Sequence, residues 1–136
     1  MTKVNNELAK TPIRVLGKDV TLPAWLEEVT SQQIIEKGKA LVESYHGLSN
    51  FHVYRRTIVA IAKGSKGSRY LTKVSIWDKE KDEVPALLTC SCPHGVYAGR
   101  GLCYHRVALI LKVLSMNGMP EPKAPQTYED DFELEG

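Results

Sequence analysis

The feature that most constrains the fold is a cluster of cysteine and histidine side chains in the stretch CSCPHGVYAGRGLCYHR, residues 90–106. All three cysteines of the 136-residue chain lie there, as Cys90, Cys92 and Cys103, and His105 follows them. One residue separates the members of each pair, and ten residues separate the pairs. Because alternate residues of an extended chain share a face, each pair can aim two side chains at one point. This pattern indicates a metal site with four protein ligands.

Zinc is the metal that this donor set favours. A structural zinc ion takes four thiolate or imidazole ligands at tetrahedral corners. Cys90 and Cys92 would end a strand, and a loop containing proline and glycine would return the chain to present Cys103 and His105 at the start of a helix. Catalytic zinc usually keeps one position for water, whereas four protein ligands close the site. The sequence therefore predicts one structural Zn²⁺ and no metal-based catalysis.

Other chemistries fit the cluster less well. A redox pair would have the spacing Cys-x-x-Cys before a helix, which the cluster lacks. A nucleophilic Cys103 with His105 as its base would have no third group to orient it. Two alternatives stay open at this point. The thiols could gather in the core without a metal, and His94 could replace His105 as the fourth ligand.

The cluster and its flanks resemble the SWIM zinc finger, a family with the pattern Cys-x-Cys, a variable spacer and Cys-x-His. In that family a strand precedes the first pair, a proline follows it, and an apolar helix begins at the histidine. YLTKVSIW, CSCPHG and CYHRVALILKVL stand in those places here. The resemblance covers residues 56–114 and implies that the zinc ligands are Cys90, Cys92, Cys103 and His105. Tyr104 departs from the basic residue that the family often carries between the last two ligands.

The rest of the pattern predicts an α+β fold. We expect a small antiparallel β-sheet, made of a hairpin plus a third strand, that leads into the zinc-bound strand-loop-helix finger. The expected elements are two short extended pieces at 13–22, a helical turn at 22–29, a helix at 31–47, hairpin strands at 51–62 and 69–77, a third strand at 84–90, and a buried helix at 104–118. Thr30 or Ser31 would cap the N-terminal helix, and Gly38 should weaken its middle.

Composition divides the chain into three expected regions. Residues 1–30 would form an N-terminal arm with short elements, and residues 31–118 a zinc-stabilised domain that contains the finger at about 88–116. Residues 119–136 are rich in proline and then acidic, and we expect this tail to be disordered.

Charge and composition also limit the classes of function that the chain can have. Residues 1–118 carry a balance of +7 and residues 119–136 a balance of −5, so the basic body and the acidic end suggest separate electrostatic roles. The sequence shows no secretory signal and no bilayer-spanning apolar run, and three cysteines cannot all pair. We expect a reducing compartment, the cytoplasm or, in a eukaryote, the nucleus. No carboxylate constellation, phosphate-cradling loop or nucleophile elbow indicates an enzyme or a small-molecule substrate.

Nucleic acid is the first expected partner. The resemblance implies it, because SWIM fingers occur in proteins that handle DNA and bind either DNA or protein. Basic and aromatic side chains in the hairpin and the finger agree with phosphate contacts and base stacking. The candidate contacts are Arg55, Arg56, Lys66, Arg69, Lys73, Tyr97, Arg100 and Arg106. The alternative is a solvated hairpin whose tyrosines belong to the core.

A protein is the second expected partner. The end of the chain, residues 126–136, sets Tyr128, Phe132 and Leu134 among acidic side chains, and such a segment could dock in a basic, apolar groove. It could also lie over the protein's own basic face, or serve only to keep the protein soluble. Two hypotheses follow: a non-enzymatic zinc-binding protein that binds DNA and/or accessory proteins in DNA transactions, and an interaction adapter whose zinc is purely structural and which binds no nucleic acid.

Overall fold

The computed structural model describes residues 12–64, 66–79, 83–93, 102–116 and 118. Two sequence predictions, the disordered acidic tail at 119–136 and the start of the N-terminal arm, lie outside these residues. So do Tyr97 and Arg100, which were candidates for nucleic-acid contacts, and His94, the alternative ligand.

The described part of the chain has α+β architecture with two antiparallel sheets, which confirms the predicted class. Strands β1 (Pro12–Val15) and β2 (Lys18–Thr21) form a two-stranded hairpin. The second sheet has the order β3-β4-β5-β6. The other elements, in chain order, are α2 (Ala24–Glu28), α3 (Gln32–Glu43), β3 (Leu48–Tyr54), β4 (Thr57–Lys63), β5 (Arg69–Ser75), β6 (Leu88–Cys90) and α5 (Tyr104–Leu114).

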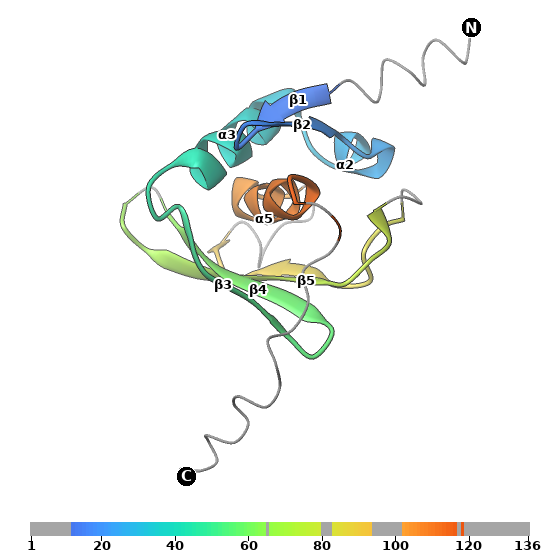
Figure 1. Ribbon diagram of the computed structural model, residues 1–136. Helices are drawn as coiled ribbons and strands as arrows, with labels where there is room; N and C mark the ends of the chain where they lie inside the picture. The colour runs from blue at the N-terminus through green and yellow to red at the C-terminus, as the bar shows by residue number, and fades with distance from the viewer. Residues whose placement is uncertain (1–11, 65, 80–82, 94–101, 117, 119–136) are drawn as a thin grey trace, which may run out of the picture.

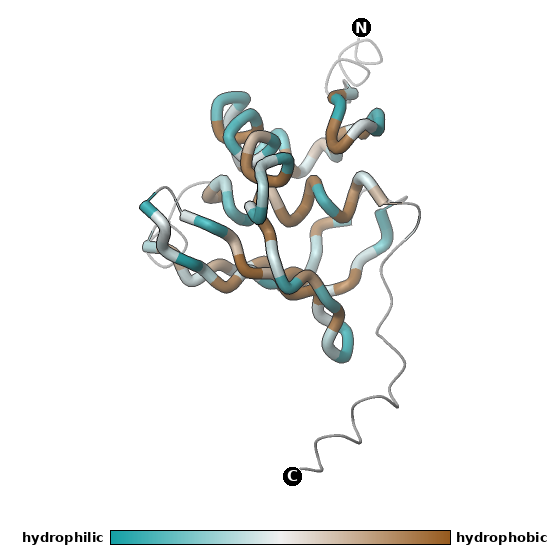
Figure 2. The backbone as a smooth tube through the Cα atoms, turned by 60° about the vertical axis from the view of Figure 1, so that its left-hand side comes forward, coloured by the Kyte–Doolittle hydropathy of each residue, from teal (hydrophilic) through white to brown (hydrophobic). Residues whose placement is uncertain are grey.

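Helix α5 lies in the middle of the molecule, between the four-stranded sheet and a layer formed by α3, α2 and the β1–β2 hairpin (Figure 1). Seven consecutive residues of this helix, His105–Leu111, are buried, as the apolar run in the sequence predicts. Figure 2 shows apolar segments gathered where the helices face the sheet and hydrophilic segments at the strand turns. The sheet uses alternate residues for this core, including Ile58, Ala60 and Val74.

One strand prediction is wrong. The sequence indicated a single strand over residues 51–62, but the structure turns the chain at Arg55 and Arg56 and divides the segment between β3 and β4. Tyr54 pairs with Thr57 across this two-residue turn. Two-residue hairpins need a positive φ at their first loop position, which normally calls for glycine or asparagine. Arg55 takes that position with a φ of 60°, so the sequence carried no conventional turn signal.

The predicted N-terminal helix is confirmed as α3, and the structure explains its internal glycine. The hydroxyl of Ser31 accepts a hydrogen bond from the Ile34 N–H, so Ser31 is the N-cap. Gly38 lies where α3 meets α5, and a Cβ atom there would come within 2.6 Å of Cγ1 of Val107. Glycine therefore lets the two helices approach closely, at a cost in helix propensity of about 1 kcal/mol relative to alanine.

The ends of the central helix are tied to other parts of the chain. The Lys79 ammonium donates hydrogen bonds to the carbonyls of Val113 and Met116, each at 3.0 Å, and to that of Gly118 at 2.8 Å. A lysine in this position stabilises carbonyls that a helix C-terminus leaves without partners. At the other end, the Leu102 N–H donates to the Val29 carbonyl at 3.0 Å.

The N-terminal elements share the core of the rest of the chain. Val15, Val20, Trp25 and Leu26 belong to the same apolar cluster as the buried face of α5. The boundary placed at residue 30 stays a prediction about folding units, although contacts join its two sides. Among the described residues, no helix is long and apolar enough to cross a membrane.

We predict that Gly38→Ala destabilises the protein by about 1–2 kcal/mol, because overpacking against Val107 outweighs the gain in helix propensity. Thermal or urea denaturation of the zinc-loaded protein measures this change. Gln33→Ala, on the exposed side of the same helix, is the control and should stay within about 0.5 kcal/mol of the parent. A Gly38→Ala protein that is more stable than the parent would contradict the close approach of the helices.

Candidate metal centre

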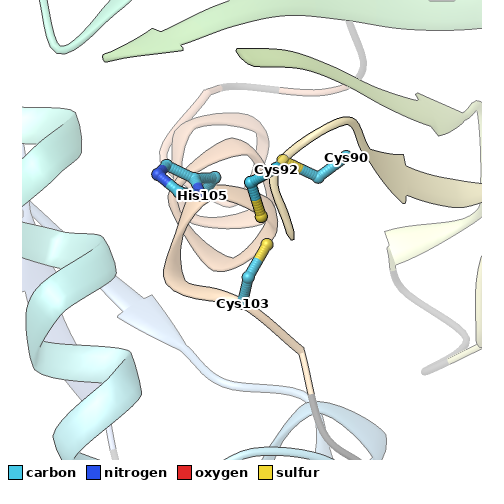
Figure 3. A group of neighbouring side chains, drawn as sticks. All are labelled: Cys90, Cys92, Cys103 and His105. Atoms are coloured by element: carbon cyan, nitrogen blue, oxygen red, sulfur yellow. The ribbon is translucent and has the colours of Figure 1, made fainter. Parts of the chain in front are cut away.

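The four predicted ligands come together at the junction of β6 and α5. Cys90 ends β6, Cys92 lies two residues further on, Cys103 is the N-cap of α5, and His105 is in the first turn of that helix. Their side chains converge (Figure 3), and one ligand atom from each residue lies within 4.8 Å of all the others. All four residues are buried.

The donor set fits a zinc ion. Zn–S bonds of about 2.3 Å at tetrahedral angles place two thiolate sulfurs roughly 3.8 Å apart, a separation that the cluster accommodates. Both ring nitrogens of His105 are buried, and neither has a hydrogen-bond partner among the described residues. A buried imidazole without partners is costly, and coordination satisfies one of its nitrogens. The cluster therefore forms a Cys3His site that is closed by protein ligands, as structural zinc requires.

Contacts within the cluster polarise two of the thiols. The hydrogen bond between Cys90 and Cys103 is the largest effect on both pKa values. It lowers the pKa of Cys103 to about 3, against the opposing effect of burial. The same contact, together with burial, raises the pKa of Cys90. Cys103 also lies at the N-terminus of α5, where the helix dipole favours a thiolate. Metal binding at this site would release thiol protons, that of Cys90 among them, because cysteine binds a metal as the thiolate.

Arg106 supports this site. Its side chain is buried, with 9% exposure, and the guanidinium donates a hydrogen bond to the Leu88 carbonyl at 3.2 Å. Its backbone N–H and side chain also favour the thiolate form of Cys103, which lowers the pKa of that thiol. A zinc ion with three thiolates and a neutral imidazole carries one excess negative charge. The buried guanidinium offsets that charge at close range.

Two tyrosine rings flank the ligand His105. The ring centroid of Tyr70 lies 4.9 Å from that of His105, and the centroid of Tyr104 lies 4.3 Å away. Tyr70 also packs against the buried cysteines. Burial is the main cause of the raised pKa of Tyr104. These rings fix the orientation of the imidazole and exclude water from the metal, as a structural site requires.

A closed Cys3His centre at a strand–helix junction defines a zinc-finger protein. Comparison with known families agrees, since residues 73–114 match the SWIM zinc finger. Within the matched residues, Cys90, Cys92, Cys103 and His105 fit the Cys-x-Cys and Cys-x-His pairs of that finger. SWIM domains bind nucleic acids or proteins. No curated protein and no solved structure matches the chain.

The structure separates the predicted nucleic-acid contacts into groups. Arg55 and Arg56 occupy the β3–β4 turn, Lys66 and Arg69 lie at the β4–β5 turn, and Lys73 is in the middle of β5. Arg106 does not join them: it is buried beside the metal ligands, so we withdraw it from the predicted contacts. The sequence did not predict that Arg106 supports the metal site, because no local pattern distinguishes a buried from an exposed arginine in the first turn of a helix.

We predict that Cys103→Ser loses zinc and lowers the melting temperature, because the variant replaces a thiolate by a hydroxyl and leaves the other ligands buried without a metal. Metal analysis should fall from about one zinc per chain to a small fraction of it. Removal of zinc from the parent by a chelator should destabilise β6 and the start of α5 in the same way. Retention of zinc and of the parental melting temperature by Cys103→Ser would refute the ligand assignment.

A second pair of variants tests whether His105 or His94 is the fourth zinc ligand. His105→Ala should lose zinc, because the convergent site then has only three ligands, whereas His94→Ala should keep both zinc and the melting temperature. A cobalt-substituted protein reports the same distinction through its visible absorption. Loss of zinc in His94→Ala with retention in His105→Ala would reverse the assignment.

Proposed function

We propose that the protein is a non-enzymatic SWIM-finger protein that binds single-stranded nucleic acid, DNA in the first instance, on the outer face of the four-stranded sheet. The observation that carries this proposal is the outer face of the sheet, where the described strands present basic and apolar side chains and no carboxylate. Helix α5 lies on the other face of the sheet (Figure 1), and so does Tyr70, whose ring contacts that of the ligand His105. In this proposal the metal has a structural role: it stabilises the sheet whose outer face binds the nucleic acid.

The charge of this face favours a polyanion. None of the strands β3, β4, β5 and β6 contains an aspartate or a glutamate. Lys63, Arg69 and Lys73 project on the outer side of β4 and β5, since they alternate with buried core residues. Arg55 and Arg56 add two guanidinium groups at the far end of the same sheet. Such a surface attracts phosphates along its length, with little dependence on base sequence.

The middle of the face suits bases rather than a paired duplex. Val59, Ile61 and Leu71 form an apolar strip in which Ile61 and Leu71 are direct cross-strand neighbours. Tyr54 is 60% exposed at one end of the sheet, and Leu71 is 38% exposed. Unpaired bases can lie on apolar and aromatic groups of this kind while basic side chains hold the backbone. A duplex would present phosphates to the strip instead.

The conformation of Arg55 also supports a binding role. A non-glycine residue with φ near 60° costs about 1–2 kcal/mol, and glycine would adopt that conformation without strain. The guanidinium lies over the Tyr54 ring, 5.3 Å from its centroid, which holds the charge beside an exposed aromatic surface. Strained residues of this kind often occur at functional sites.

We predict that Arg55→Gly weakens binding to an oligothymidylate but does not lower the melting temperature, because the variant relieves strain while it removes one phosphate contact. In fluorescence-anisotropy titrations at several salt concentrations, the slope of log K against log salt should become smaller in magnitude by about 0.7. Lys18→Gln, on the distant β1–β2 hairpin, is the matched control and should leave the slope unchanged.

The same titration decides between the two hypotheses. The parent should bind single-stranded DNA more tightly than the matching duplex. If neither binds at low salt, the nucleic-acid proposal is wrong and the adapter hypothesis takes its place. Capture of a protein partner by the full chain but not by a chain without residues 126–136, after nuclease treatment, would support that adapter role.

A further inference from the structure

A cavity of about 420 Å³ opens at one end of the outer sheet face, near the β4–β5 turn. This volume lies within the range of sites that hold small molecules or parts of larger ones. The cavity is built from the segment after α3 and from three adjacent strands, and its lining residues are His46, Ser49, Asn50, Ile61, Lys63 and Arg69. Among the described residues, this lining has the cations Lys63 and Arg69, three other polar side chains and no carboxylate.

The two cations face each other in an unfavourable arrangement. Lys63 and Arg69 are direct partners across the antiparallel β4–β5 pair. Like charges opposite each other on neighbouring strands are destabilising, because their Cβ atoms lie only about 5 Å apart. Among the described residues, neither side chain forms an ion pair or a hydrogen bond. An anion between them would turn this repulsion into two attractions.

Polar side chains of the β3 segment add hydrogen-bond donors to the lining. A register shift interrupts β3 between Ser49 and His52, and bulges of this kind redirect side chains. Asn50, inside the irregularity, has a φ of 53°, and His46 has a φ of 57°. Within the described part of the chain, the hydroxyl of Ser49 and the amide of Asn50 have no hydrogen-bond partner. Both groups can donate to an anionic oxygen.

We infer that this cavity is a phosphate-binding pocket, in which Lys63 and Arg69 hold a phosphodiester of the bound strand and Ser49 and Asn50 donate hydrogen bonds to its oxygens. The inference rests on the proposed function, because the pocket opens on the same sheet face. Ile61 contributes both to the pocket wall and to the apolar strip, so a phosphate in the pocket would place the adjoining sugar and base along the strip. The pocket would thus set the position of the bound nucleic-acid strand on a sheet face that otherwise binds with little dependence on base sequence.

Lys63→Glu gives the sharpest test, because it separates binding from folding. The variant replaces a like-charged cross-strand pair by an opposite-charged one, so its melting temperature should equal or exceed that of the parent. Its affinity for an oligothymidylate should fall about ten- to a hundredfold, as expected for the loss of a charge-assisted hydrogen bond. Lys18→Glu makes the same charge change on the β1–β2 hairpin and should have a much smaller effect on affinity.

Asn50→Gly is the second variant, because glycine keeps the positive φ and removes only the side-chain amide. Its affinity should fall several-fold with an unchanged melting temperature. If the parent binds the oligonucleotide and both Lys63→Glu and Asn50→Gly bind it as tightly as Lys18→Glu does, the pocket inference is wrong and the proposed function stands. If the parent binds no nucleic acid, the proposed function is wrong.

Titration of the zinc-loaded protein with inorganic phosphate and with thymidine 5′-monophosphate, followed by amide NMR, identifies the source of the phosphate. Saturable shifts at Ser49, Asn50, Lys63 and Arg69 with either probe, lost in Lys63→Glu, support a pocket for phosphate groups. Such shifts in a protein that binds no oligonucleotide would assign the pocket to free phosphate or a mononucleotide. The absence of shifts with both probes, together with unaltered oligonucleotide binding by Lys63→Glu, overturns the inference.

Discussion

The burial of helix α5 on all sides is the constraint on which the rest of the structure depends. One side packs against α3, where Gly38 allows close approach to Val107, and the other side packs against the four-stranded sheet. The backbone groups at the ends of a buried helix need partners from the protein, because water does not reach them. Its C-terminal carbonyls are satisfied by Lys79, and its N-terminal turn carries two metal ligands. The zinc site is therefore the N-terminal anchor of the central core helix.

The metal centre explains a charge that the core would otherwise not tolerate. Arginine is rarely buried unless it is paired, and Arg106 lies among apolar residues of α5. The excess negative charge of a zinc ion with three thiolates provides its partner, and the Leu88 carbonyl accepts one of its hydrogen bonds. Arg106 thus joins the metal centre to β6 from the side of the helix, while Cys90 joins it from the side of the strand.

The sequence predicted the parts of the fold that depend on local chemistry. The spacing of Cys90, Cys92, Cys103 and His105 was sufficient for the metal site, because tetrahedral coordination restricts which residues can converge. The apolar run after His105 predicted a buried helix, and Ser31 was a candidate cap for α3. The β3–β4 turn could not be predicted, since Arg55 adopts a positive φ that only tertiary structure makes acceptable.

The pocket residues could not be predicted either. Ser49 and Asn50 meet Lys63 and Arg69 only through the register of three strands and an irregularity in β3, and neither leaves a periodic signal. The burial of Arg106 could not be predicted for the same reason. Arg106 is buried by the packing of α5, whereas Arg69 is exposed because of its place in the alternation of β5. Local patterns identified the metal ligands, whereas long-range pairing determined the surface that we propose to bind.

Strand β5 connects that surface to the metal, because its alternate residues serve the two faces. Tyr70 contacts the ligand His105 and Thr72 pairs with the ligand Cys90, while Arg69, Leu71 and Lys73 face outward. Ser91, between the first two ligands, exchanges hydrogen bonds with the backbone of Leu71. The register of β5 and β6 is thus fixed next to zinc, and a one-residue slip would exchange the two faces. A structural ion on one side of the sheet therefore holds the basic side chains in place on the other.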